Sequence, residues 1–250
     1  MSGHSKWANI KRRKAVVDEK KGRVFSRLAR EISALARSGG PNPDANAALK
    51  AAIDRAREQN LPMDNIQRAI ARGAGAEGGS AYEEIWYEGF GPGAVAILVE
   101  AMTDNRNRTA ADIRHLFSRS GGNLGETGSV GWMFDASGVV SVPKDGQSED
   151  ALMERVLEAG ADDLQNEDDM FVVLCQPAAL TEVRKVLETA GVQVADAEVS
   201  RLPKVRTHIS GEDAARLLHL LDQLEEHDDV QRVFANFDID EDELERLENA

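Results

Sequence analysis

Apolar side chains in the first third of the chain recur at the spacing of amphipathic helices. Over residues 20–37 they are three or four positions apart, at Val24, Leu28, Ile32 and Leu35. Basic residues form a neighbouring stripe on the same stretch, at Lys20, Arg23, Arg27 and Arg30. The pattern predicts a helix that packs on one face and presents cations on another, and that ends at the Gly-Gly-Pro of residues 39–41.

Two further short helices are expected before residue 75. The second is predicted to begin at Asn42-Pro43-Asp44, with Asn42 as its cap and Pro43 in its first turn. The third is predicted to begin at residues 61–64 and to end at Gly73. Its inner face would consist of Met63, Ile66 and Ile70. Three helices joined by short links are typical of a small bundle.

From residue 82 onward, short apolar and aromatic runs replace the helical spacing. Residues 82–88 and 94–102 flank a Gly-rich turn, which predicts a hairpin. A helix capped near Thr109 and a short strand over 130–134 follow. Near the C-terminus, a Leu-rich helix from Gly211 and a strand over 230–237 are expected, and residues 238–243 are expected to form a solvated acidic tail.

Between these two groups of elements lies a separate pattern of strands and helices. Strands are predicted over 138–142, 162–169, 171–175 and 192–199, and helices over 149–159 and 177–190, with Leu152, Val156 and Leu157 inward. The order β, α, β, β, α, β is that of a ferredoxin-like domain. We therefore predict a multidomain α+β protein with an N-terminal helical domain (1–80), a central α/β domain split in sequence (81–135 plus 206–250) and an inserted ferredoxin-like domain (136–205).

Charge is distributed very unevenly along this chain. Its total is −14, yet residues 1–37 hold eleven Lys or Arg and three Asp or Glu, a net of +8. Residues 136–250 carry a net of −18. A cluster that opposes the sign of the whole protein indicates a surface that binds a polyanion. Trp7 lies among these cations, where it could stack on a base; the alternative is a solvated basic tail whose Trp7 packs on the body of the protein.

Two later segments are also candidates for phosphate contacts. Arg106 and Arg108 are predicted in a polar loop between strand and helix, either as a second nucleic-acid contact or held by ion pairs to Asp104 and Asp112. The Gly-rich residues 121–129 either bring backbone N–H groups to a phosphate or connect strands with glycine at unusual dihedral angles. They lack the P-loop sequence.

Other functional classes find little support in the sequence. The five histidines lack the HExxH spacing, no GxSxG occurs, and Cys175 lies in an apolar run, so we expect no enzyme, no catalytic residue, no metal site and no cofactor. A metal-dependent hydrolase that uses the acidic C-terminal half is the weakest alternative. No stretch has the roughly 20 apolar residues of a membrane helix, and no secretory signal is evident, so a cytoplasmic protein without a membrane partner is expected.

Several motifs together resemble the YebC/PmpR family, which includes the mitochondrial translational activator of cytochrome oxidase. They are Gly3-His4-Ser5-Lys6-Trp7 with Ile10-Lys11, Phe25, the run Thr103-Asp104-Asn105-Arg106-Asn107-Arg108-Thr109, and residues 121–125 with Gly128-Ser129-Val130. The resemblance spans nearly the whole chain. It implies the same three domains and a cytoplasmic regulator of gene expression; family members are described as DNA-binding transcriptional regulators and are also tied to translation on the ribosome.

The resemblance and the charge pattern together predict a nucleic-acid-binding regulator. We expect a ribosome-associated translation factor that binds ribosomal RNA through the basic N-terminal domain; the alternative is a regulator that binds promoter DNA. No helix-turn-helix is recognisable, which favours phosphate-dominated binding over base reading. The predicted contact residues are Lys6, Trp7, Lys11, Arg12, Arg13, Lys14, Lys20, Arg23, Arg27, Arg30, Arg106 and Arg108. The sequence leaves the oligomeric state undetermined.

Overall fold

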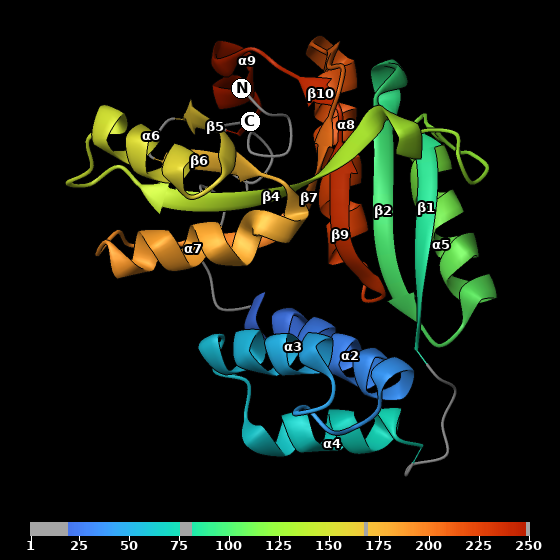
Figure 1. Cartoon of the computed structure of the whole chain (residues 1–250). Helices are drawn as coiled ribbons and strands as arrows, with labels where there is room; N and C mark the ends of the chain where they lie inside the picture. The colour runs from blue at the N-terminus through green and yellow to red at the C-terminus, as the bar shows by residue number, and fades with distance from the viewer. Residues whose placement is uncertain (1–19, 76–81, 168–169, 249–250) are drawn as a thin grey trace. The chain divides into compact units, whose positions relative to one another are not determined.

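A computed structural model describes residues 20–75, 82–167 and 170–248 (Figure 1). The chain folds into two compact units. In the described part, one unit consists of residues 132–206, and the other contains residues 20–131 and 207–248. The α+β class, the helical bundle, the split central domain and the inserted domain are confirmed. The division into three domains at the predicted residues stays a prediction.

Three helices form the bundle: α2 (Lys20–Gly39), α3 (Ala47–Glu58) and α4 (Met63–Gly73). Their core contains Ile32, Leu49, Ile53 and Ile66. The predicted cap Asn42 is wrong, because Asn46 caps α3 by accepting a hydrogen bond from Leu49 N at 3.1 Å. Its amide also donates to the carbonyls of Leu35 and Gly40, so this buried side chain joins the end of α2 to the start of α3. Met63, predicted inside, is 45% exposed because α4 begins there, at the edge of the core.

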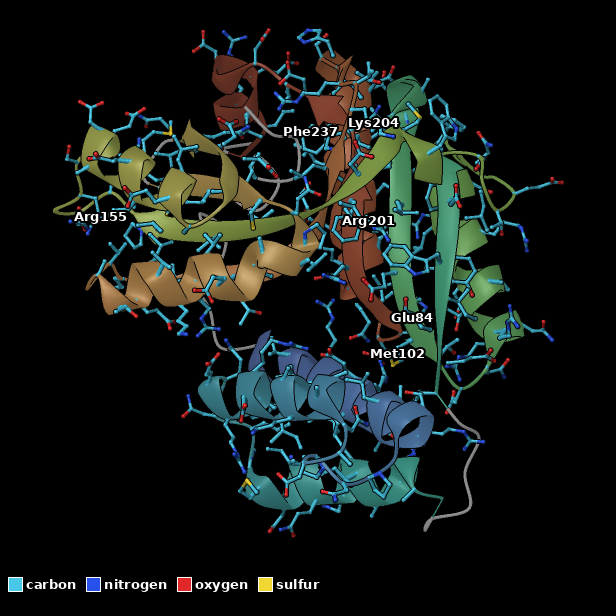
Figure 2. The ribbon with its side chains drawn as sticks, in the orientation of Figure 1. Glu84, Met102, Arg155, Arg201, Lys204 and Phe237 are labelled. Atoms are coloured by element: carbon cyan, nitrogen blue, oxygen red, sulfur yellow. The ribbon has the colours of Figure 1, made fainter. Side chains whose placement is uncertain are left out.

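The central sheet has the strand order β3-β1-β2-β9. Strands β1 (Glu83–Phe90) and β2 (Ala96–Thr103) form the predicted hairpin. Their register pairs Glu84 with Met102, two residues labelled in Figure 2. Strand β9 (Val230–Ala235) runs antiparallel to β2, so the chain returns to this sheet after the inserted unit. Helices α5 (Arg106–Arg119) and α8 (Gly211–Glu226) contact each other and cover one face (Figure 1).

Two predictions near this sheet are wrong. The expected strand over 130–134 is replaced by a 3-10 turn, η2 (Gly131–Met133), and the edge position belongs to the two-residue strand β3 (Asn123–Leu124). The predicted acidic tail is structured: β10 (Phe237–Asp238) pairs in parallel with β8 (Thr207–His208), and α9 (Glu241–Glu248) follows. The acidic segment is structured because it contains two apolar side chains, Ile239 and Leu244, that are buried in the fold.

The inserted unit has the ferredoxin-like order β4-α6-β5-β6-α7-β7 and the sheet order β5-β6-β4-β7. Its elements are β4 (Phe134–Pro143), α6 (Glu149–Glu158), β5 (Ala161–Asn166), β6 (Met170–Cys175), α7 (Leu180–Thr189) and β7 (Asp196–Pro203). Strand β4 begins four residues before the predicted strand because residues 134–141 pair with β7. Lys204, labelled in Figure 2, adds an ion pair to Asp135 at 3.0 Å.

One side chain of this unit was predicted on the wrong side. Leu152 and Val156, four residues apart on α6, are buried in the core that α6 and α7 share with the sheet. Leu157 is 52% exposed, because the next position on a helix is rotated by about 100°. No helix in the described part of the chain is both long and apolar enough to cross a membrane.

Candidate nucleic-acid interface

The predicted contact residues fall into two groups. Lys6, Trp7, Lys11, Arg12, Arg13 and Lys14 lie outside the described residues, and so do the side chains of Lys20 and Arg23, whose backbone belongs to α2. The remaining four predicted residues have described side chains: Arg27, Arg30, Arg106 and Arg108. Their positions show which predicted cations the folded chain already uses for its own contacts.

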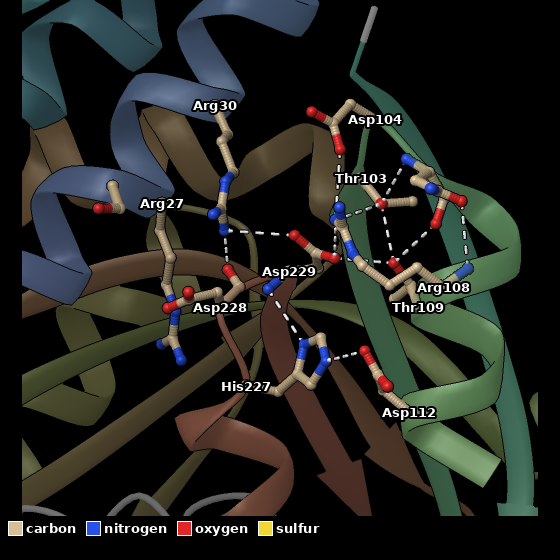
Figure 3. A network of polar contacts seen from close by, with 12 residues as sticks. Arg27, Arg30, Thr103, Asp104, Arg108, Thr109, Asp112, His227, Asp228 and Asp229 are labelled. Atoms are coloured by element: carbon tan, nitrogen blue, oxygen red, sulfur yellow. Dashed lines mark hydrogen bonds and ion pairs between the residues drawn. The ribbon is translucent and has the colours of Figure 1, made fainter. Parts of the chain in front are cut away.

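Arg27 and Arg30 lie one turn apart on α2 (Figure 3). Arg27 reaches the last turn of α8, and Arg30 reaches the segment that connects α8 to β9. Arg27 donates to the backbone carbonyl of Glu225, and Arg30 donates to that of Asp228. The Arg30 guanidinium also lies 3.7 Å from the Asp229 carboxylate, and its side chain is only 17% exposed. These two arginines therefore join the bundle to the central domain within one compact unit.

The Asp229 carboxylate is the centre of this polar network (Figure 3). One of its oxygens accepts hydrogen bonds from Arg108 Nη2 and from Thr109 Oγ1, both at 2.7 Å. Burial raises the pKa of Asp229, but the bonds from Arg108 and Thr109 outweigh burial and hold that pKa below its ordinary value. The side chain is 4% exposed, so Asp229 is a buried carboxylate kept ionised by its neighbours.

Arg106 and Arg108 lie in the first turn of α5, and the prediction of a polar loop there is wrong. Asn105 caps this helix by accepting a hydrogen bond from Arg108 N at 3.1 Å, which starts the helix earlier than the predicted cap near Thr109. Arg108 also contacts Asp104 at 3.2 Å, as expected for an ion-paired segment. Arg106 is 66% exposed and lies 3.6 Å from Glu83.

His227 completes the network at the other side of Asp229. Its Nδ1 accepts a hydrogen bond from Asp229 N at 3.1 Å, and its Nε2 lies 3.4 Å from the Asp112 carboxylate (Figure 3). One of the two alternatives drawn from the sequence paired Asp112 with an arginine of the same segment. The partner shown is a histidine that is 115 residues away in the sequence.

The Gly-rich segment 121–131 binds an anion, and that anion belongs to the protein itself. The Glu88 carboxylate, on β1, accepts hydrogen bonds from the backbone N–H groups of Gly128, Val130 and Gly131 at 2.8, 2.7 and 2.6 Å. Burial raises the pKa of Glu88, and these three bonds together outweigh burial and lower it. Gly128 has φ of +89°, so this residue also uses the dihedral freedom of glycine.

Comparisons with known proteins cover nearly the whole chain. Residues 5–76 match the family described as the TACO1/YebC protein N-terminal domain, and residues 82–237 match its second and third domain. The chain belongs to the TACO1/YebC family. The resemblance noted from the sequence motifs is therefore confirmed.

Relatives with curated names are similar over their full length. A protein of Pelotomaculum thermopropionicum is 55% identical over 96% of this chain and 100% of its own, and one of Geobacter sulfurreducens is 49% identical over 99% and 100%. Both are named probable transcriptional regulatory protein. A crystal structure of a conserved hypothetical protein of Aquifex aeolicus matches with a TM-score of 0.82 and 44% identity, over 91% of this chain and 94% of that one.

Two carboxylates at the centre of the site in this TACO1/YebC protein, those of Asp229 and Glu88, were not predicted from the sequence. Glu88 lies within β1 and Asp229 lies directly before β9, and neither residue belongs to a recognisable motif. Their partners are 121 and 40 to 43 residues away in the sequence. The signal in the sequence was indirect: the partner segments contain more hydrogen-bond donors than acceptors close by. Buried donors need acceptors, so an acceptor from elsewhere in the chain could have been expected.

Proposed function

We propose that this protein is a nucleic-acid-binding regulator of gene expression that acts as a ribosome-associated translation factor. In this proposal the basic N-terminal domain binds ribosomal RNA, and the protein works in the cytoplasm without a catalytic step. The observation that carries the proposal is the reversal of charge along the chain, from +8 over residues 1–37 to −18 over residues 136–250. A polyanion attracts the first part and repels the second, which orients the molecule on it.

The described contacts suggest how the predicted cations divide their work. Arg27, Arg30 and Arg108 have partners within the chain, so we assign them chiefly to holding the bundle and the central domain together. We assign the RNA contacts to Lys6, Trp7, Lys11, Arg12, Arg13, Lys14, Lys20 and Arg23. Exposed Arg106 is an additional candidate, since a pair at 3.6 Å with Glu83 in solvent is a weak competitor for a phosphate.

Sedimentation of a cell lysate tests the ribosomal part of the proposal. At low salt the protein should move with the ribosomal fractions, and added salt should release it, because the contacts are made mainly to phosphates. A variant in which Lys11, Arg12, Arg13 and Lys14 are replaced by Ala is expected to leave the ribosomal fractions at lower salt. Absence of the intact protein from these fractions at low salt would contradict the proposal.

A second candidate function is transcriptional regulation on promoter DNA. It is favoured by the printed names of the relatives, which are called probable transcriptional regulatory proteins. A gel-shift assay with labelled promoter DNA distinguishes it from general phosphate binding. Unlabelled promoter should compete much better than unrelated DNA if the protein controls specific genes, whereas equal competition by both would rule out sequence-specific control.

A further inference from the structure

A groove lies between α2 and α4 of the bundle. Its volume is about 600 Å³, within the range of pockets that hold small ligands. Of the described residues that line it, three are arginines, namely Arg30, Arg68 and Arg72, and none is Asp or Glu. In a chain whose net charge is −14, this concentration of positive charge requires an explanation.

The two helices that form the groove are in close contact at Gly73, the last residue of α4. At Gly73, an added Cβ would lie 2.2 Å from the carbonyl oxygen of Ser33, so α4 and α2 approach as closely there as glycine permits. Toward the N-terminus of α2, the side that faces the groove carries the small residues Gly22, Ser26 and Ala29. Small side chains leave the space open that larger ones would fill.

The arginines are held in positions that favour an anion. Arg68 donates from Nη2 to the Asn65 side chain at 2.5 Å and from Nε to the Asp64 carbonyl at 3.2 Å, so its planar group is fixed without a carboxylate in these bonds. Arg72 follows one turn later on α4, where two like charges destabilise a helix. Its pair with Asp104, at 4.0 Å and partly in solvent, is weak. A phosphate between the two arginines would remove their repulsion and match the fork of each guanidinium.

An aromatic platform lies beside these cations. The Arg72 guanidinium carbon is 4.8 Å from the centroid of the Tyr82 ring, and that of Arg30 is 5.8 Å from it. Half-buried Phe25 lines the same groove. Proteins recognise unpaired RNA by stacking its bases on aromatic rings and on guanidinium planes. A base in a duplex is already stacked and paired, so only an unpaired nucleotide can use such a groove.

We infer that the α2–α4 groove binds an unpaired nucleotide of RNA, with its phosphate at Arg68 and Arg72 and its base against the Arg72–Tyr82 platform. Ser26 and Asn65, which also line the groove, are polar groups of the kind that bond to the ribose 2′-hydroxyl. This inference rests on the proposed function, because it specifies which form of RNA the N-terminal domain takes.

Fluorescence anisotropy with a labelled oligouridine, titrated with the full-length protein, tests this inference. The double variant Arg68→Gln/Arg72→Gln is compared with Lys50→Gln/Arg57→Gln, which removes two charges from exposed positions on α3. The groove variant should weaken binding by about 5- to 150-fold beyond the α3 variant, the loss that corresponds to one stacked base. Tyr82→Ala should weaken binding similarly, and Tyr82→Phe should retain it. Circular dichroism establishes that each variant is folded.

The outcomes separate this inference from the proposed function. If the unaltered protein binds oligouridine and both double variants lose affinity equally, the groove is not the site, although RNA binding by the N-terminal domain stands. If the unaltered protein binds no RNA of any form, both fail. An RNA duplex of the same length tests the requirement for an unpaired nucleotide. If the unaltered protein bound the duplex as tightly as oligouridine, and the groove variant lost affinity for both equally, that requirement would be overturned. Oligodeoxythymidine serves as a DNA probe of the same kind. If the groove variant lost affinity for oligodeoxythymidine but not for oligouridine, the choice of RNA would be overturned.

Discussion

The central domain and the helical bundle treat their anion-binding groups in opposite ways. In the central domain, the N–H groups of residues 128–131 bind Glu88, and Arg108 binds Asp229. In the bundle, Arg68 and Arg72 line a groove that has no Asp or Glu among its described lining residues, and the Asp104 carboxylate lies 4.0 Å from Arg72. The first region supplies its own anions, and the second is built to take one from elsewhere. The sequence motifs at residues 103–109 and 121–129 had indicated candidate phosphate contacts in the first region.

This difference shows how to separate structural from functional cations. A guanidinium or a set of N–H groups that already holds a buried carboxylate would have to exchange that partner for a ligand, and breaking such a contact costs the folded state stability. A group without such a carboxylate can bind a phosphate at little cost to the fold. We therefore expect variants of the central network to change stability first, and variants of the groove to change binding first.

The largest effect is expected at Glu88. Replacing it by Ala leaves one buried and two partly buried N–H donors without their acceptor and should lower the free energy of unfolding by about 3–5 kcal/mol. Urea denaturation followed by circular dichroism measures this loss. An effect below about 1 kcal/mol would mean that water replaces the carboxylate easily, and the segment would then be open to an external anion.

The same carboxylate gives the fold a defined dependence on pH. The pKa of Glu88 in the folded protein is lower than its ordinary value of 4.5, so its stabilisation is present above that pH and is lost as the pH falls through the folded pKa. Glu88→Gln should therefore reduce the difference in unfolding free energy between neutral pH and pH below 4.5. An unchanged difference would assign the acid sensitivity to other groups, such as Asp229, whose pKa is lowered too.

A somewhat smaller effect is expected at Asp229. Replacing it by Ala removes the acceptor of Arg108 and Thr109 and the ion-pair partner of Arg30, and should cost about 2–3 kcal/mol. The cost is smaller than at Glu88 because the Arg108 side chain is 47% exposed and can turn to water. Thermal unfolding measures it, with Asp112→Ala as a control, because Asp112 is 50% exposed. Equal losses in the two variants would contradict a central role for Asp229.

The contact between α2 and α4 should respond to a single methyl group. Gly73→Ala places a Cβ against Ser33 and should destabilise the bundle by about 1–3 kcal/mol, the usual cost of overpacking. Gly22→Ala on α2 is the matched control, since an added Cβ there meets nothing within 4 Å and alanine favours a helix by about 0.5–1 kcal/mol. Opposite signs in thermal unfolding would support the account of how the groove is formed; the same sign would contradict it.

Local patterns predicted most elements of this fold. The leucines of α8 and the turn between β1 and β2 were recognisable because their spacing and turn residues act within a few positions of each other. The misplaced ends and strands depended on distant partners: β3 exists through its pairing with β1, and α9 is anchored by buried Leu244. Short-range spacing contains no information about such partners.

The candidate site was less predictable than the fold for the same reason. The arginines at 106 and 108 were visible as a charged motif, but the carboxylate that holds Arg108 is 121 residues away. The groove joins residues of α2, α4 and Tyr82, none of which forms a motif with the others. Charge composition did indicate which third of the chain to search, because a net charge is a sum and needs no knowledge of the folded arrangement.

The salt dependence of RNA binding tests the central claim most directly. Binding of a structured ribosomal RNA fragment is measured by anisotropy at several salt concentrations, for the intact protein and for the variant with Ala at Lys11, Arg12, Arg13 and Lys14. The account predicts weaker binding by the variant and a slope of log affinity against log salt that is flatter by about 0.7–0.9 for each phosphate that the variant no longer neutralises. An unchanged affinity and slope would contradict the claim that the basic N-terminal segment holds the RNA.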